Sequence, residues 1–304
     1  MNTFSLALIS AVLLSAPLLY AALGELLSET AGVINIELEG MMLCGAFAGV
    51  LATSFSGSVI LGFLAAAASG LLVAAVHGLT CLIFRANQVV SGIILNILAL
   101  GVTSYLLSTV LAPRGGQSVA ILSPVSIPVL SQLPVIGEAF FDQNVMVYVA
   151  YLTVLLVWWL LNRTVIGLAL KAAGERPITA EALGVEVQWT RWLALLACGC
   201  LAGVGGGQLA LAGLGIFTRN MTAGRGFIAL AAVIFGRWNA FGTAAAVLIF
   251  AAADALQIRA QALGVGIPYQ FLVMLPYVVT VVALAGFLRP MRPPSSLGVN
   301  YEES

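Results

Sequence analysis

The sequence predicts an all-α polytopic membrane protein of about eight to ten transmembrane helices, with discontinuous or re-entrant segments among them. Hydrophobic residues make up 61% of the chain and charged residues only 8%, and the mean hydropathy is +1.09. In soluble domains roughly a quarter of the residues are charged. A bilayer core of ~30 Å needs about 20 apolar residues per helix, and charge-free runs of that length recur at 1–24, 40–84, 86–113, 143–162, 192–218 and 260–288.

These runs define the elements in chain order. The first is predicted to be a retained span, because no Lys or Arg precedes Arg85 and a signal peptide begins with positive charge. The run at 40–84 is divided into two spans near Ser54–Ser58. Together with the breakers between them, the runs predict a single transmembrane domain over 1–304, with helices at about 3–24, 32–52, 58–83, 87–111, 144–162, 191–213, 223–237, 240–259 and 268–288.

Two long loops connect these helices. The loop at 112–143 contains four prolines around an apolar middle, and we expect it to pack on the membrane face as short helices. The stretch from Arg163 to Arg191 carries seven of the 24 charges and is predicted to face water.

Lys and Arg residues set the orientation, because they are enriched in cytoplasmic loops. The 163–191 loop holds four of the twelve, so we expect it to be cytoplasmic together with Arg85, Arg237 and the residues after Leu288. The 112–143 loop is then extracytoplasmic. The N-terminus lies outside if every earlier segment crosses fully, whereas a segment that enters and returns within 31–56 would reverse it.

Two entries to spans share a polar, glycine-broken texture, at Gly32–Gly40 and at Arg219–Gly226. Such entries, one in each half of a chain, are typical of discontinuous helices that line a transport path. An ordinary interfacial loop is the alternative. Few charged residues are candidates for the membrane interior, chiefly Glu37, Glu39, Arg225 and Asp254, and the lack of a firm acidic centre weighs against an ion-coupled transporter.

The chain lacks the parts of several chemistries. His77 is the only histidine and Lys171, preceded by Leu170, the only lysine, so neither a His-based metal site nor a Walker A loop is predicted. Protease motifs are missing as well. We therefore predict no enzyme activity, no metal and no cofactor. The four cysteines lie in apolar surroundings and are predicted to pack as small hydrophobes, and the glycines around Gly45 and Gly203 are predicted to let helices approach closely.

A short helix is predicted within the 163–191 loop. Pro177 suits a first helical turn and Gly184 suits a left-handed end. The helix between them would be ~10 Å long, too short to be stable alone in water. It must dock, through Ile178, Ala182 and Leu183, either on a partner protein or on its own bundle.

Four ordered motifs resemble one family. Residues 167–184, reading Gly-Leu-x-Leu-Lys-Ala-Ala-Gly-Glu-x-Pro-x-x-Ala-x-x-x-Gly, are similar to the coupling loop of bacterial ABC importer permeases of the ribose and branched-chain amino acid class. Residues 31–43 and 220–239 look more specifically like the nucleoside (simple sugar) branch of that family, and residues 90–96 add a fourth match. The chain departs from the more usual pattern by having Glu37 in place of Gly and Ala240 in place of Pro.

The resemblance implies a permease subunit in the bacterial cytoplasmic membrane. Its partners would be ABC ATPase subunits, a second and often different permease chain, and an extracytoplasmic solute-binding protein. The solute would be neutral and polar. A nucleoside or related purine or pyrimidine compound is the first candidate for the solute, and a ribose-type sugar is the second. The alternatives to an importer subunit are an ion-coupled secondary transporter and a membrane scaffold. No nucleic acid partner is implied. Residues implied to couple to the ATPase are Gly174, Glu175, Arg176, Pro177, Ala180, Leu183 and Gly184.

A second set of residues is predicted to line the translocation path or to brace its broken helices. They share amide or charged side chains beside the two glycine-broken entries or within the 90–96 motif. Side-chain amides both donate and accept hydrogen bonds, which suits a solute with hydroxyl groups and a base. These residues are Asn35, Glu39, Asn96, Asn220 and Arg225.

Overall fold

The computed structural model describes residues 3–114, 118–128, 130–132, 136–263, 268–275, 278 and 292–301. Its long helices are α1 (Thr3–Thr30), α2 (Leu38–Ser56), α3 (Val59–Gly78), α4 (Gln88–Leu106), α6 (Val145–Arg163), α9 (Val187–Gly207) and α11 (Ala240–Ala262). π-helical turns extend α3, α4 and α9 over Leu79–Ile83, Leu107–Leu111 and Gln208–Leu214. Shorter helices are α5 (Ile136–Phe141), α7 (Val165–Glu175), α8 (Pro177–Ala182), α10 (Arg225–Phe235) and α12 (Tyr269–Val273).

Within the described residues, 7 helices are long and apolar enough to cross a membrane, and α10 is a shorter apolar helix. This confirms the predicted fold class. Most of the span predicted at 268–288 lies outside the described residues. Two predicted boundaries were wrong: α1 continues to Thr30 rather than ending near 24, and α2 begins at Leu38 rather than near 32. Polar residues of 25–30 find partners inside the protein, such as the Asn35 amide, which donates to Glu25 Oε1 at 3.1 Å.

The described part of the 112–143 loop contains short helices, as expected: α5 and two 3₁₀ helices at Ala112–Arg114 and Leu130–Gln132. It also contains a pair of strands that the sequence did not predict. Strands β1 (Pro124–Ser126) and β2 (Asp142–Asn144) pair antiparallel, with Val125 opposite Gln143. The hydroxyl of Ser126 donates to Asp142 Oδ1 at 2.6 Å. These partners are 16 residues apart in the sequence, so no local sequence pattern predicts that they pair. Gly115, Gly116 and Pro134 lie outside the described residues.

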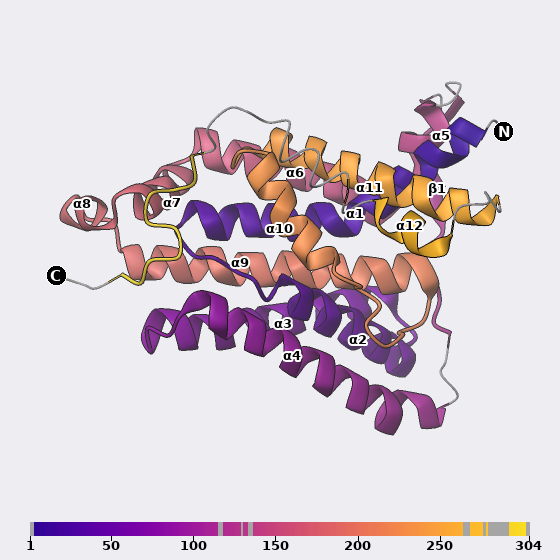
Figure 1. Ribbon diagram of the computed structural model, residues 1–304, viewed down its shortest axis with the longest axis horizontal. Helices are drawn as coiled ribbons and strands as arrows, with labels where there is room; N and C mark the ends of the chain where they lie inside the picture. Colours follow the sequence, from indigo (N-terminus) through magenta and orange to yellow (C-terminus); the bar gives the residue numbers. More distant parts are fainter. Residues whose placement is uncertain are drawn as a thin grey trace.

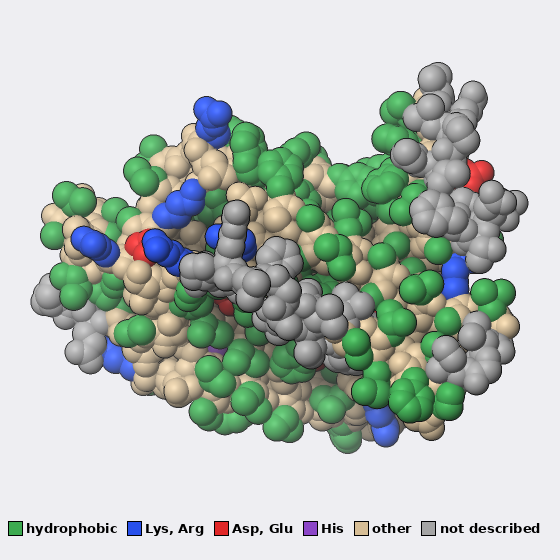
Figure 2. Space-filling model, turned by 45° about the horizontal axis from the view of Figure 1, so that its top comes forward, with side chains coloured by type: hydrophobic (Ala, Val, Ile, Leu, Met, Phe, Trp, Pro, Cys, Tyr) green, Lys and Arg blue, Asp and Glu red, His purple; other side chains and the backbone are tan. Residues whose placement is uncertain are grey.

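The two ends of the molecule differ (Figure 1). Helices α7 and α8 and the segment 292–301 lie at one end, where α1 ends and α9 begins, and α5 and the pair of strands lie at the other. On the face shown in Figure 2, Lys and Arg side chains gather mainly at the α7–α8 end, and apolar side chains spread over the middle. Charged ends around an apolar belt are what a membrane-spanning bundle requires. The start of α1 lies opposite the α7–α8 end (Figure 1).

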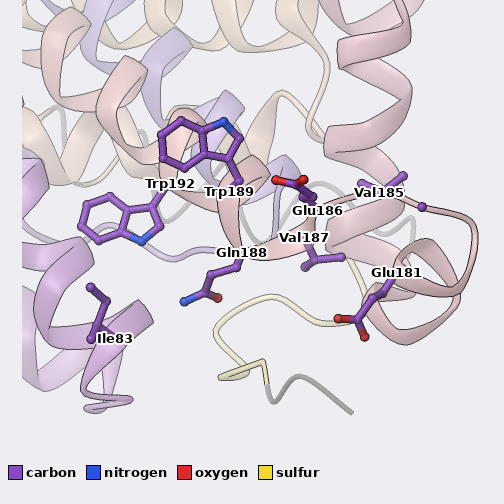
Figure 3. A pocket seen from close by; sticks show the side chains of 9 residues that line it. Ile83, Glu181, Val185, Glu186, Val187, Gln188, Trp189 and Trp192 are labelled. Atoms are coloured by element: carbon purple, nitrogen blue, oxygen red, sulfur yellow. The ribbon is translucent and has the colours of Figure 1, made fainter.

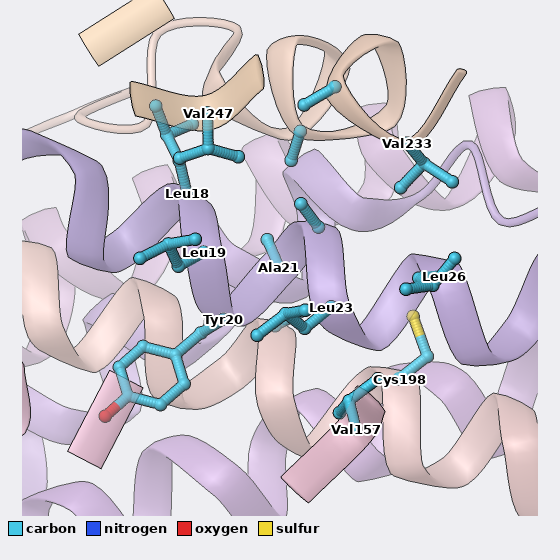
Figure 4. Packing of buried hydrophobic residues seen from close by; sticks show 14 of the residues in the cluster. Leu18, Leu19, Tyr20, Ala21, Leu23, Leu26, Val157, Cys198, Val233 and Val247 are labelled. Carbon is cyan, nitrogen blue, oxygen red and sulfur yellow. The ribbon is translucent and has the colours of Figure 1, made fainter. Parts of the chain in front are cut away.

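Helix α1 forms the centre of the core. Leu18, Leu23 and Leu26 are each at most 1% exposed, and Figure 4 shows side chains of α6, α9, α10 and α11 around this helix. Small residues let the helices approach closely, as predicted: a Cβ on Gly45 would lie 2.3 Å from the Gly203 carbonyl oxygen of α9. In a membrane such close packing, rather than hydrophobic exclusion, holds helices together.

Candidate functional site

The non-helical segment between α1 and α2, residues 31–37, is the first of two breaks, and we call it the first break. At Gly32, whose φ is +93°, it turns back and runs without helical structure to Leu38. Asn96 of α4 braces this break, because its Nδ2 donates to the Ile36 carbonyl at 2.9 Å and its Oδ1 accepts from the Gly40 amide at 2.7 Å. One side chain thus satisfies a backbone group on each side of the helix start, as backbone at membrane depth requires.

The second break is the non-helical segment 215–224 that precedes α10, and the Glu39 side chain of α2 is hydrogen-bonded to its end. This carboxylate accepts hydrogen bonds from Thr222 Oγ1 at 2.6 Å, the Gly224 amide at 2.8 Å and the Gly226 amide at 2.7 Å. Only glycine fits at 226, since a Cβ there would lie 2.3 Å from the Glu39 nitrogen. The amino ends of α2 and α10 therefore meet, and a carboxylate of one caps the other, as expected at the positive end of a helix dipole.

A buried polar cluster lies behind the first break. Glu37 and His77 are fully buried, with Oε1 and Nδ1 3.1 Å apart. Oriented with its amide nitrogen toward Glu37, Asn35 donates to both oxygens of that carboxyl at 2.9 and 2.8 Å. Its own amide N–H donates to Glu25 Oε1 at 3.1 Å. Among the described residues, no group of three or more His, Cys, Asp or Glu side chains is arranged to hold a metal ion.

Two carboxyl groups of this interior were not predicted from the sequence. Glu25 is fully buried and Glu29 is 3% exposed, and Trp238 donates its indole N–H to Glu29. Their spacing of four residues at the end of an apolar run was a usable signal, because such a pair shares one face of a helix. Trp238 follows α10, so this contact joins the ends of α1 and α10.

The structure brings together four of the five predicted path residues and separates one. Asn35, Glu39 and Asn96 surround the first break, and Arg225 begins α10 beside Glu39. Arg225 lies 3.7 Å from Asp254 of α11 and also donates to the Thr222 carbonyl at 3.2 Å. These four side chains support the broken helices.

Asn220 is exposed, in a groove between the second break and α4. Its φ is +55°, a conformation that Asn tolerates better than most residues. The groove has a volume of about 650 Å³, and its lining residues are Ile97, Leu100, Gly101, Ser104 and Tyr105 of α4, Ser108 of the π turn that follows α4, and Arg219 and Asn220 of the break. Its wall is mainly apolar, and its polar groups are the tyrosine and serine hydroxyls, an amide and a guanidinium.

The predicted short helix is present at the α7–α8 end of the molecule. Helix α8 begins at Pro177 and is followed by Gly184, whose φ is +87° and whose amide donates to the Glu181 carbonyl at 2.8 Å. Ala180 packs inward at 3% exposed, whereas Ile178 and Leu183 are 67% and 80% exposed. An apolar surface of this kind at an end of the bundle fits a protein partner.

A pocket lies beside this helix (Figure 3). It has a volume of about 540 Å³, and its walls include Glu181, Gln188, Trp189, Trp192 and Ile83 at the end of α3's π turn. Trp189 is 59% exposed. The pocket adjoins α8, because Glu181 of α8 and Gly184 after it are among the residues that line the pocket.

The remaining predicted coupling residues connect α7 to the bundle. A Cβ on Gly174 would lie 2.1 Å from the Thr30 carbonyl oxygen, so only glycine fits there. Glu175 is exposed and accepts from Ser295 Oγ at 2.7 Å, and Arg176 is exposed between α7 and α8. The expectation that Arg191 faces water was wrong: it is 0% exposed, because backbone carbonyls from three separate segments surround it.

Comparison with known proteins gives a consistent result. Residues 7–284 match the family described as branched-chain amino acid transport system / permease component. The chain is 36% identical to a nucleoside ABC transporter permease of Lactococcus lactis subsp. cremoris, with 100% of this chain and 98% of the relative covered. It is also 36% identical to a guanosine ABC transporter permease of Bacillus subtilis over 94% of this chain and 93% of the relative. A putative glucose ABC transporter permease of Haloferax volcanii is 38% identical over 87% and 81%. No solved structure matches the chain.

Proposed function

Since the chain belongs to the branched-chain amino acid transport system permease family, we propose that it carries a nucleoside, or a related purine or pyrimidine compound, across the membrane. It is a multi-pass permease component of an ABC importer, so ATP is hydrolysed by separate ATPase subunits and an extracytoplasmic binding protein delivers the solute. The nucleoside assignment draws on two relatives of nearly full coverage. The glucose relative makes a simple sugar the second candidate.

The groove between α4 and residues 219–220 is the observation that carries this proposal. Its volume of about 650 Å³ lies within the ~300–1,000 Å³ typical of small-molecule sites. The Tyr105 ring, 66% exposed, offers a stacking face for a base, and Ser104, Ser108 and Asn220 offer groups for ribose hydroxyls. An exposed guanidinium such as that of Arg219 is costly against lipid, so we assign this face to the path. A second permease chain would supply its other wall.

Uptake in vesicles with the ATPase and the binding protein tests the solute. Radiolabelled guanosine should accumulate only with ATP, and unlabelled glucose in excess should not compete with it. Transport of glucose but not of any nucleoside would move the protein to the sugar branch. Accumulation by the permease alone, without ATP, would overturn the importer assignment.

Single cysteines introduced at the predicted path residues locate the path. A cysteine at Asn220 should react with a small water-soluble thiol reagent, and solute should protect it, because this residue is exposed in the groove. A cysteine at Asn35, which is 0% exposed, should stay unreactive. The unmodified chain is the control, since its four cysteines are free. An inert cysteine at Asn220 would place the path elsewhere.

We also propose that α8 and the pocket beside it dock the ATPase. Replacing Gly184 with Val should uncouple transport, because a β-branched residue resists the left-handed conformation at φ +87°. Gly57→Val is a matched control at the end of α2, where φ is +70° and a Cβ likewise meets nothing within 4 Å. Copurification of the ATPase and solute-stimulated ATP hydrolysis should fall for Gly184→Val only. Equal values for both variants would make α8 a cap on its own bundle.

A further inference from the structure

The segment 292–301, which we call the strap, passes between α7 and the start of α9 (Figure 1). Its first hydrogen bonds are to the end of α7. Ser295 Oγ donates to Glu175 Oε2 at 2.7 Å, and the Ser296 amide donates to the Gly174 carbonyl at 2.9 Å. Ser296 itself is 9% exposed. The strap therefore packs against the residues that join α7 to α8.

The strap is bonded next to the first break. The Gly298 amide donates to the Gly32 carbonyl at 3.0 Å, at the point where the chain turns back from α1. Gln88 supplies a second connection: its Oε1 accepts from the Ile34 amide at 2.8 Å, and its Nε2 lies 3.5 Å from Asn300 Oδ1.

A third connection reaches the turn between α3 and α4. Asn300 Nδ2 donates to the Arg85 carbonyl at 2.6 Å. Helix α4 begins at Gln88, three residues further on, and carries the Asn96 side chain that braces the first break. The strap is thus hydrogen-bonded directly to the first break, at Gly32, and also to the turn that leads into α4, at Arg85.

Arg191 joins the strap to the ends of α1 and α7 from inside the protein. Its Nε donates to the Ala31 carbonyl at 3.1 Å and its Nη1 to the Val299 carbonyl at 2.9 Å. Its Nη2 donates to Ser296 Oγ at 3.3 Å and lies 3.4 Å from the Ala173 carbonyl. A planar guanidinium with five donors can hold several acceptors in one fixed geometry. The end of α1, the end of α7 and the strap share this one side chain.

We propose that the strap and Arg191 transmit ATPase-driven movement of α7 and α8 to the first break. The proposal rests on the docking role proposed for α8. Gly174 lies against the Thr30 carbonyl without room for a Cβ, so α7 cannot shift toward α1 without moving the strap and the end of α1. Displacement of the strap then pulls on Gly32, and through Gln88 on Ile34, which lead to the helix start braced by Asn96.

The double substitution Ser296→Ala with Asn300→Ala tests the strap in the assembled importer. It removes the hydroxyl bonded to the Gly174 carbonyl and the amide bonded to the Arg85 carbonyl, and leaves α8 untouched. ATPase copurification should be unchanged, while solute imported per ATP should fall about two- to thirtyfold, the range that corresponds to the coupling energies changed by mutations along coupled networks. Val299→Ala is the matched control, because Arg191 contacts only the backbone carbonyl of that residue.

Each outcome decides the proposal. Unchanged import per ATP in the double variant would overturn it, and so would loss of ATPase copurification, because the strap would then belong to the docking surface itself. Should the double variant fail to insert, Asn300→Ala alone, which removes the hydrogen bonds of this side chain to Gln88 and to the Arg85 carbonyl, is read in the same way. Absence of ATPase binding or uptake in the unmodified importer would instead refute the proposed function.

Discussion

Glu39 is the residue whose replacement most directly tests the meeting of the two broken helices. In Glu39→Ala, three donors at the start of α10 lose their acceptor: the Thr222 hydroxyl and the amides of Gly224 and Gly226. A buried donor without a partner costs about 1–3 kcal/mol, so the three together cost roughly 3–9 kcal/mol before relaxation. Because typical net stabilities are about 5–15 kcal/mol, Glu39→Ala should unfold at a markedly lower temperature than the unmodified protein.

Glu39→Gln separates the number of acceptors from the presence of the side chain. The amide oxygen still accepts, but the amide nitrogen faces backbone N–H groups, so at least one of the three bonds is lost, at a cost of about 1–3 kcal/mol. The favourable interaction of a carboxylate with the amino end of α10 is lost as well, typically about 0.3–1 kcal/mol. We therefore expect stability to fall in the order Glu, Gln, Ala.

The measurement is the thermal unfolding temperature of each purified variant in the same detergent. Scan rates must match, because irreversible unfolding makes that temperature rate-dependent. Glu138→Gln is the control, since Glu138 is exposed on α5. If Glu39→Ala unfolds at the same temperature as the unmodified protein and this control, the three hydrogen bonds do not hold α10 in place.

Two further predictions concern other contacts of the bundle. Asn96→Asp keeps an acceptor for the Gly40 amide but replaces the donor to the Ile36 carbonyl with a carboxylate oxygen; we expect faster hydrogen exchange at 31–40, and unchanged exchange would contradict the bracing role. Gly203→Ala puts a Cβ 2.2 Å from the Ala66 carbonyl oxygen, so overpacking should cost about 1–3 kcal/mol. Gly213→Ala, whose Cβ would meet nothing within 4 Å, should leave the unfolding temperature unchanged; equal effects of the two would contradict the close-packing account.

The features that the sequence predicted well are those with a local physical cause. Charge-free runs determine where helices cross a bilayer, and their positions matched seven long helices within a few residues at most ends. Pro177 and Gly184 define α8 because one fixes φ and the other permits a positive φ. The glycine-broken entries predicted both breaks, since irregular backbone survives at membrane depth only where protein or a watery cavity covers it.

The features that the sequence could not predict depend on partners far along the chain. Arg191 looked water-facing because its neighbours are charged, yet its acceptors Ala31 and Val299 are 160 and 108 residues away. The same holds for Asn96, whose partners are Ile36 in the first break and Gly40 in α2, 60 and 56 residues away. Such contacts follow from how helices pack, which periodicity alone does not specify.

The electrostatics of the facing helix starts bear on the kind of solute carried. Two helix amino ends that meet would create a positive region suited to an anion. Here Glu39 already occupies the amino end of α10, and Glu37 lies at the start of α2 beside His77. An anionic solute would have to displace the Glu39 carboxylate from its three donors. Otherwise it would approach that negative charge with those three donors already taken. A neutral solute bound through hydroxyls and a base meets neither obstacle. This agrees with the proposal that a nucleoside passes along the groove beside Asn220, while the Glu39 carboxylate stays bonded to the start of α10.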